Sequence, residues 1–225
     1  MMDNKMAPPK EEPDRYTYDP MDVRPVELEH NGANLGWWPH HYLSITRPIL
    51  PLNPSPNGLV YETAPLEEDL EISGFPKLTA WISLDTPDTD FQLMLYEVFP
   101  DGRSLVLAVD HMRARYRESQ MRQKLIEPGE INRYEFRTFT FVARRVAKGS
   151  RLRLVLMSPN SIFAEKNYNS GGLVSHESGK DARTVHVIVY HDAEHPSSLS
   201  LPPSDDASAS SPRELGRPTI ANRSE

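Results

Sequence analysis

The chain of 225 residues contains no cysteine. This absence excludes a disulfide framework, a thiolate metal site and a thiol nucleophile, and it agrees with a reducing compartment. The sequence also lacks an apolar signal region at its start and any run approaching the ~20 apolar residues of a membrane helix. We therefore expect a soluble, cytoplasmic protein that does not bind membranes.

Proline is scarce in the middle of the chain. Of the 21 prolines, eleven lie in residues 1–65 and five in residues 196–225, which leaves five for the 130 residues between them. The centre is rich in β-branched and aromatic residues and can bury a core, whereas the polar ends cannot. We predict an extended, proline-rich arm and loop over residues 1–57, a folded domain over residues 58–202 and a flexible tail over residues 203–225.

Excess positive charge is also lacking. The formal net charge of -7 argues against a general nucleic-acid binder. Basic residues do gather in one short segment, but acidic residues lie close to them, which predicts an internal salt-bridge network. The basic residues are Arg113, Arg115, Arg117, Arg122 and Lys124, and the acidic residues are Asp110, Glu118 and Glu127.

Regular alternation of apolar and polar residues predicts β-strands. Three segments place their apolar side chains on one face with a period of two. A fourth segment, residues 90–99, is apolar on both faces, as in a central strand, and Pro100-Asp101-Gly102 after it predicts a hairpin. The alternating sets are Leu78, Ala80, Ile82 and Leu84; Leu152, Leu154 and Leu156; and Val185, Val187 and Val189.

About eight strands and hardly a helix predict an all-β fold, a sandwich of two antiparallel sheets. A jelly roll is the topology we expect, and an immunoglobulin-like sandwich remains the alternative. Tyr134 and Phe136 share one parity while Phe139 and Phe141 share the other. A bulge near Thr138 within a single strand would reconcile the two sets.

The chain contains no Gly-x-Ser-x-Gly sequence, the nucleophile elbow of α/β-type serine hydrolases. Serines, histidines and aspartates occur elsewhere, so a triad assembled from distant residues remains an alternative. His191 and His195 are four residues apart, but Pro196 and the preceding strand argue against the helix that would align them on a metal. His40 and His41 are adjacent in an extended segment, where their side chains diverge.

The sequence offers residues for two further kinds of site. Asp85, Asp88, Asp90 and Asp101 could hold a calcium ion, although hydrogen bonding of aspartates within turns explains them more simply. Exposed aromatic residues could stack on a sugar, although aromatic residues of a sandwich more often lie in its core. The aromatic candidates are Trp81, Tyr96 and Tyr116.

A series of short motifs occurs in a fixed order between residues 61 and 202, with a weaker match at residues 16–20. In chain order they are Tyr61-x-Thr63-x-Pro65-Leu66, Asp85-x-Pro87-Asp88-Thr89-Asp90-Phe91, Pro100-Asp101-Gly102-Arg103-Ser104, Arg113-x-Arg115-Tyr116-Arg117, Glu127-Pro128-Gly129-Glu130 and Tyr190-His191-Asp192-x-Glu194-His195-Pro196-Ser197. Together they resemble the C-terminal, non-catalytic domain of X-Pro dipeptidyl-peptidase and cocaine-esterase type serine hydrolases.

The resemblance implies a galactose-binding-type jelly roll that packs beside an α/β-hydrolase domain, in the same or a separate chain. In such enzymes that other domain carries the Ser-Asp-His triad. None of the triad positions has a counterpart here, so we expect no catalytic residue, no cofactor and no metal in this chain. A homo-oligomer is left open.

The function expected is therefore that of an accessory domain of a serine hydrolase. A free-standing module that binds a carbohydrate or small ligand is one alternative, and a self-contained enzyme is another. We expect Asp90 to pair with an arginine of residues 113–117 and to set the hairpin register.

The residues expected to play structural roles are Asp88, Asp90, Arg113, Arg115, Tyr116, Arg117, His191, Asp192 and His195. Four aromatic residues are expected to form the surface that docks on the hydrolase domain, and they are Trp37, Trp38, Phe163 and Tyr168.

Overall fold

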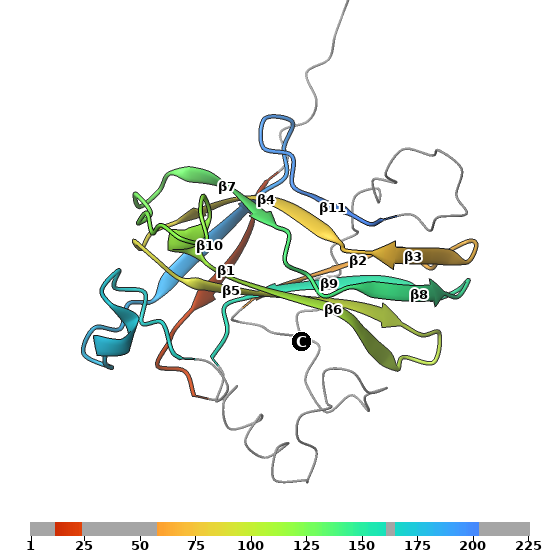
Figure 1. Cartoon of the computed structure of the whole chain (residues 1–225), viewed down its shortest axis with the longest axis horizontal. Helices are drawn as coiled ribbons and strands as arrows, with labels where there is room; N and C mark the ends of the chain where they lie inside the picture. The colour runs from red at the N-terminus through yellow and green to blue at the C-terminus, as the bar shows by residue number, and fades with distance from the viewer. Residues whose placement is uncertain (1–11, 24–57, 161–164, 203–225) are drawn as a thin grey trace, which may run out of the picture.

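The chain folds as antiparallel β-sheet (Figure 1). A computed structural model describes residues 12–23, 58–160 and 165–202. Within these ranges, no helix is long and apolar enough to cross a membrane. The strands are β1 (Asp14–Tyr18), β2 (Gly58–Glu62), β3 (Leu70–Gly74), β4 (Lys77–Leu84), β5 (Asp90–Val98), β6 (Ser104–Arg113), β7 (Ile131–Phe136), β8 (Val142–Val146), β9 (Arg151–Met157), β10 (Val185–Tyr190) and β11 (Ser198–Ser200), and the 3₁₀ turns are η2 (Ala114–Tyr116) and η3 (Val174–His176).

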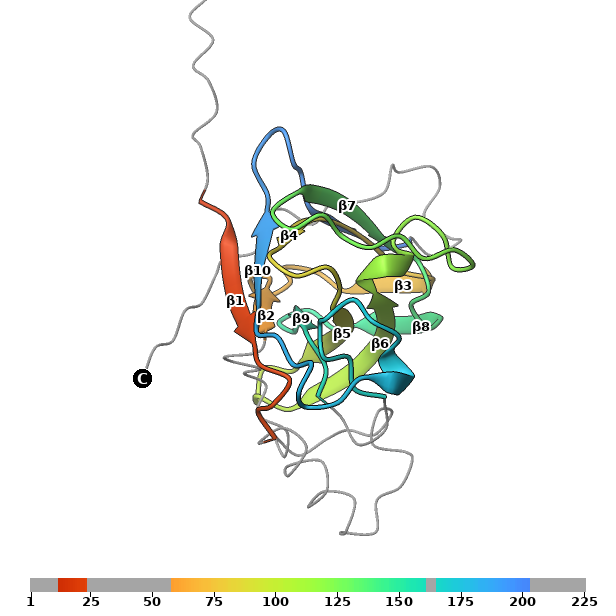
Figure 2. The ribbon, with the colours of Figure 1, turned by 90° about the vertical axis from the view of Figure 1, so that its left-hand side faces the viewer.

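The strands form two main sheets. Sheet A has the order β1-β10-β4-β11, with β7 also paired to β4, and sheet B has the order β2-β9-β5-β6. Strands β3 and β8 pair in a small third sheet, and all these pairs are antiparallel. Figures 1 and 2 show sheets A and B as two layers. The all-β sandwich is thus confirmed, while its jelly-roll topology stays a prediction.

The core lies between the two layers. The apolar side of β4 faces inward as the alternation predicts, and so does one side of β5 from sheet B. Fully burying such a side chain stabilises the fold by about 1.5–3 kcal/mol. The buried side chains of these two strands are Leu78, Ala80, Ile82 and Leu84 on β4, and Phe91, Leu93 and Leu95 on β5.

Strand β5 is buried on both faces, as expected for a central strand. It lies between β9 and β6 in sheet B. Met94, Tyr96 and Val98 point away from the main core, and they form a second apolar cluster with Val106 and Val155. This is why the segment shows no alternation in the sequence.

The segment expected to be one bulged strand consists of two strands. Strand β7 belongs to sheet A, whereas β8 pairs with β3. Between them, the backbone N–H of Thr138 donates to Asp110 of β6 over 2.9 Å. Phe139 is buried and Phe141 is 55% exposed. The change of parity therefore marks a crossing between sheets, and the bulge prediction is wrong.

Two short strands lie outside the segments expected to be strands. Residues 14–18, assigned from the sequence to the extended arm, form β1 at the edge of sheet A, where Tyr16 and Tyr18 are buried. Strand β11 follows the strand expected to be the last one and pairs with β4. Strand β11 has only three residues and is too short to show a period in the sequence. Strand β1 lies between Pro13 and Pro20, which favoured the prediction of an extended arm.

Several connections meet at one end of the sandwich, on the left of Figure 1. Strand β5 starts from this end and β6 runs into it, because the two are antiparallel neighbours. Strand β4 also runs into this end, since the short connection at residues 85–89 leads from its last residue to the start of β5. We call this region the loop end. It comprises residues 19–23, 85–89, 114–130 and 165–184.

Candidate functional site

The first polar contact at the loop end joins the two strands of the β5–β6 hairpin. Asp90 opens β5 and lies directly opposite Arg113, the last residue of β6. The Arg113 guanidinium donates through Nε to Asp90 Oδ1 over 2.8 Å and through Nη2 to Oδ2 over 3.1 Å. Such a two-point contact has one favourable geometry, so it favours this register over its neighbours.

A second arginine–carboxylate pair lies deeper. Beyond Arg113 the chain makes the 3₁₀ turn η2, which directs Arg115 to Asp88 in the β4–β5 connection. Asp88 accepts the backbone N–H of Arg115 over 2.9 Å and its Nε–H over 2.8 Å. The Asp88 side chain is 0% exposed and that of Arg115 is 5% exposed. Each charge is stabilised by the other in a region that water does not reach.

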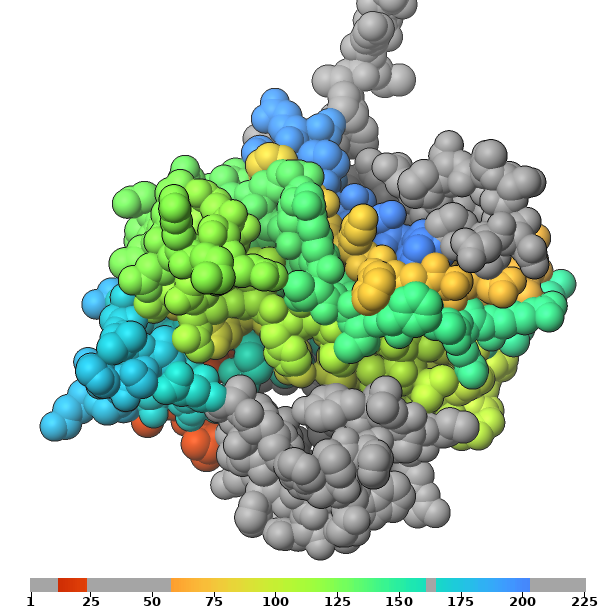
Figure 3. All heavy atoms as spheres, viewed as in Figure 1, coloured from red at the N-terminus to blue at the C-terminus, as the bar shows by residue number. Residues whose placement is uncertain are grey.

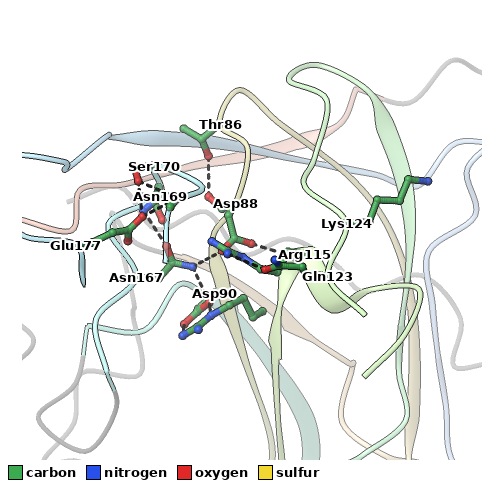
Figure 4. Close-up of polar contacts among 12 residues, drawn as sticks. Thr86, Asp88, Asp90, Arg115, Gln123, Lys124, Asn167, Asn169, Ser170 and Glu177 are labelled. Carbon is green, nitrogen blue, oxygen red and sulfur yellow. Dashed lines mark hydrogen bonds and ion pairs between the residues drawn. The ribbon is translucent and has the colours of Figure 1, made fainter. Parts of the chain in front are cut away.

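Asn167 joins the two pairs. Its amide nitrogen donates to Asp88 Oδ2 over 2.8 Å and to Asp90 Oδ1 over 2.9 Å. Asn167 comes from the long connection between β9 and β10, so the contact ties this connection to the hairpin (Figure 4). We call Asp88, Asp90, Arg113, Arg115 and Asn167 the buried network.

Asn167 and its neighbours belong to the site but are not among the residues expected from the sequence. The backbone N–H of Asn169 donates to Asn167 Oδ1 over 2.8 Å, and the Asn169 amide donates to the carbonyl of Arg183. Asn169 has a φ of 63°, the one non-glycine residue of the described ranges with a positive value. Two asparagines just before Gly171-Gly172 were the available signal, since asparagine tolerates this conformation and bonds to nearby backbone.

Arg117 and Tyr116 occupy different environments. The Arg117 guanidinium donates to Asn132 Oδ1 over 3.0 Å and to the carbonyl of Lys124 over 2.7 Å, which holds the β6–β7 connection against the start of β7. The Tyr116 side chain is 36% exposed on the outer side of η2. The motif Arg113-x-Arg115-Tyr116-Arg117 thus supplies three arginines that each fasten a different segment.

The electrostatics of the buried network are those of a structural element. Burial raises the pKa of the Asp88 carboxyl, and the hydrogen bonds from Asn167 and Arg115 oppose this rise because they favour the charged form. The oxygens of Asp88 are directed to donors within the chain. The network therefore fastens loops to one another.

Gly171 lets the long connection approach the β4–β5 connection closely. Its φ is +84°, and a Cβ placed there would lie 2.8 Å from Cγ of Pro87. Gly102 in the β5–β6 hairpin has the same φ of +84°, with nothing within 4 Å of such a Cβ. The two glycines thus share their backbone conformation but differ in their surroundings.

We expect Gly171→Ala to destabilise the protein more than Gly102→Ala does. Both variants place a side chain at positive φ, at about 1–2 kcal/mol each. Only Gly171→Ala adds the clash with the stiff proline ring, worth about 1–3 kcal/mol more. Urea unfolding of both variants measures the difference. Equal losses would show that residues 171 and 87 are not in contact in solution.

The histidine motif lies away from the buried network, beyond the end of β10. His195 Nδ1 lies 3.2 Å from Asp192 Oδ1, and the His195 ring packs edge-on against Trp81 at 5.3 Å between centroids. His191 Nε2 lies 3.4 Å from the Asp14 carboxylate of β1. These contacts fasten the chain after β10 to the strands beside it.

Ser197, the serine of the histidine motif, is bonded to backbone groups. The Ser197 hydroxyl donates to the carbonyl of Tyr190 and accepts the backbone N–H of Trp81. Within the described residues, no hydrogen bond joins a serine hydroxyl to the ring of His186 or His195.

The metal and sugar alternatives gain no support. Each of the four aspartates considered for calcium has a side-chain partner of its own: Asp85 has His186, Asp88 has Arg115, Asp90 has Arg113 and Asp101 has Arg103. Over the ranges that the structure describes, no group of three or more His, Asp or Glu side chains could hold a metal ion. The aromatic candidates for a sugar site do not share a surface. Trp81 of β4 packs on His195, Tyr96 of β5 is buried, and Tyr116 of η2 is exposed.

Three of the four aromatic residues expected to form a docking surface lie outside the described residues, and they are Trp37, Trp38 and Phe163. The pair His40 and His41 also lies outside them. Tyr168 is described and half-buried, with the Lys166 ammonium 5.8 Å from the centre of its ring. It belongs to the connection that carries Asn167. The surface as a whole stays a prediction.

Comparison with known proteins places this arrangement in a family. The family model described as "X-Pro dipeptidyl-peptidase C-terminal non-catalytic domain" matches residues 3–200. The cocaine esterase of Rhodococcus sp. (strain MB1 Bresler) is 33% identical over 197 residues, which are 85% of this chain and 32% of the esterase.

Two solved structures share the fold. An α-amino acid ester hydrolase superposes with a TM-score of 0.72 at 24% identity, over 86% of this chain and 33% of that protein. An aminopeptidase from a marine sediment Thaumarchaeota archaeon superposes with a TM-score of 0.71 at 22% identity, over 87% of this chain and 33% of that one. The chain thus spans about a third of the length of these relatives. With a family model matched over most of its length, the chain belongs to the family of X-Pro dipeptidyl-peptidase C-terminal non-catalytic domains.

Proposed function

We propose that this chain is the accessory β-sandwich of a serine hydrolase and packs against a separate catalytic domain, which it supports. The catalytic domain is of the α/β-hydrolase type and lies in the same or a separate polypeptide. The observation that carries the proposal is the match of residues 3–200 to a non-catalytic domain, in relatives about three times as long.

The site agrees with this role. The charged side chains of the buried network form hydrogen bonds with one another and with Asn167, and these bonds hold the loops together. A substrate site needs polar groups that converge on a space left open for a ligand. A supporting domain needs a rigid surface, and hydrogen bonds that join several loops to one another contribute rigidity.

The test uses the hydrolase segment encoded upstream of residue 1 or in a neighbouring gene. We expect that segment to carry Gly-x-Ser-x-Gly and to form a stable complex with this chain when the two are expressed as separate polypeptides. The hydrolysis of a p-nitrophenyl ester or an X-Pro amide should require the hydrolase segment. Gel filtration and the two assays measure these outcomes.

Two results would contradict the proposal. One is a hydrolase segment that elutes as a monomer in gel filtration and does not bind the added chain. The other is turnover by the isolated chain that a serine-directed inhibitor removes. The second result would restore the self-contained enzyme.

A further inference from the structure

The exposed apolar side chains gather at the loop end. Eight large apolar side chains of the described residues are exposed. Six of them belong to the loop end, whereas Phe75 and Phe141 lie elsewhere. The six are Met21, Val23, Tyr116, Met121, Leu125 and Leu173, and we call them the apolar loop surface.

These side chains come from three connections that contact one another. Leu125 of the β6–β7 connection lies beside Gly171 and Pro87, since a Cβ at residue 171 would be 3.6 Å from its Cδ1. The turn at residues 20–22 is tied to the long connection by Lys166, whose Nζ donates to the carbonyl of Pro20 over 2.8 Å. Figure 3 shows residues 114–130 in green and residues 165–184 in cyan on the same side of the molecule.

The exposure of these residues is large. Met121 is 90% exposed and Leu173 is 62% exposed, although both sit on connections that are firmly held. Single exposed apolar residues are ordinary on a protein surface. A group of them at one end of a domain marks an interaction surface.

Hydrogen bonds join the loops beneath the surface to one another. The buried network fastens the β4–β5, β6–β7 and β9–β10 connections together. Glu177 holds the loop around Leu173 by accepting the backbone N–H groups of Tyr168 and Gly172 over 3.1 and 3.0 Å, and the hydroxyl of Ser170. Loops that are ordered before binding lose less entropy when a partner docks.

Charged residues of both signs border the apolar loop surface. Glu118 and Lys124 pair with each other over 2.7 Å beside Met121 and Leu125. Glu177 and Lys180 lie along the chain close to Leu173. An apolar centre with a polar border is the usual composition of an interface between protein domains.

We infer that the apolar loop surface is the face on which this chain docks against the hydrolase domain. The inference rests on the function proposed above and adds to it the surface that makes the contact. The occupant is that domain because the relatives are about three times as long as this chain, and the matched part is a non-catalytic C-terminal domain. The other two thirds are the partner for which such a surface is available.

Phe75 and Phe141 provide a matched control. They are 54% and 55% exposed and pack edge-to-face on each other at 5.3 Å between ring centroids. Phe75 precedes the start of β4, whereas the loop end follows its last residue, so the control pair lies toward the opposite end of that strand.

The experiment measures the affinity of the full chain for the separately expressed hydrolase segment by calorimetry. We expect Leu125→Asp combined with Leu173→Asp to weaken binding by about tenfold to a hundredfold, because charges would be buried in an apolar contact. Phe75→Asp combined with Phe141→Asp should leave the affinity within about twofold of the parent. Circular dichroism and urea unfolding show whether each double variant is folded, and alanine at the same positions replaces any variant that is not.

The outcomes separate the two proposals. Suppose that the parent chain binds the hydrolase segment. If the double variant at residues 125 and 173 then binds as tightly as the parent, or if the double variant at residues 75 and 141 loses as much affinity, the docking face is wrong and the proposed function stands. Parent chain that does not bind the hydrolase segment would overturn the proposed function and the docking face with it.

Discussion

Replacing Asp88 with alanine is expected to lower the free energy of unfolding by about 3–5 kcal/mol. The side chains of Asp88 and Arg115 are 0% and 5% exposed, so the variant leaves the guanidinium charge buried without its counter-ion. Asn167 loses one of its two acceptors at the same time. Equilibrium unfolding in urea measures the loss.

A second substitution tests the cause. Adding Arg115→Met to the Asp88→Ala variant should restore part of the lost stability, because it removes the unpaired charge and keeps an apolar side chain of similar length. Lys124→Ala removes an ion pair to Glu118 that is exposed on both sides, and its unfolding midpoint should match that of the parent. Strictly additive losses for the two changes at residues 88 and 115 would contradict this account.

Asp90→Ala should lower the free energy of unfolding by less than Asp88→Ala does and by more than the loss of an exposed ion pair. Its partner Arg113 is 26% exposed, so water can solvate the guanidinium once the carboxylate is gone. We expect a loss of about 1–2 kcal/mol. A variant that unfolds like the parent would show that this pair does not stabilise the hairpin register.

Phe91→Ala is expected to lower the free energy of unfolding by about 3–5 kcal/mol, as much as Asp88→Ala. Phe91 is 0% exposed at the start of β5, where its ring meets Tyr134 and Phe136 of β7 edge-on at 5.4 and 6.1 Å between centroids. It therefore connects sheet B to sheet A. The truncation removes apolar burial and leaves a cavity that stiff neighbouring strands fill poorly.

The same chemical change at an exposed site is the control. Phe75→Ala removes a ring that is 54% exposed, and its effect should stay below about 1 kcal/mol. Thermal or urea unfolding of the two variants gives the comparison. Similar losses at residues 75 and 91 would mean that the two sheets do not pack together at Phe91.

Alternation along the chain was sufficient to place the inward faces of β4 and β10. Val185, Val187 and Val189 are buried as expected, because a strand with one buried face must repeat every two residues. The Pro100-Asp101-Gly102 turn was equally local, since Gly102 supplies the positive φ that the hairpin uses. Such features depend on neighbours a few residues away.

Other features depended on residues far apart. Strand β1 pairs with β10, so Tyr16 lies opposite Val187. The sequence of residues 14–18 does not indicate that this segment pairs with β10. The crossing at residues 137–141 produced a change of parity that a bulge would explain equally well, and only the sheet assignments of β7 and β8 distinguish the two.

The polar site shows the same division. The arginines and aspartates of the buried network were evident as a dense motif, and an Asp90 ion pair was expected. Asn167 was not, because an asparagine in a long Asn-, Gly- and Ser-rich connection is usually a turn residue. Its role appears only where the fold brings the connection to Asp88 and Asp90.

By itself, then, the sequence determined the fold class, the inward faces of the main strands and the absence of a nucleophile elbow, since these follow from residue identity and short-range spacing. The tertiary structure decided which strands share a sheet, which loops the buried network joins and where the exposed apolar side chains gather. Sheet pairing and charge burial join segments up to about 175 residues apart (Asp14 pairs with Val189). Their free energy depends on distances and exclusion of water that no local pattern encodes.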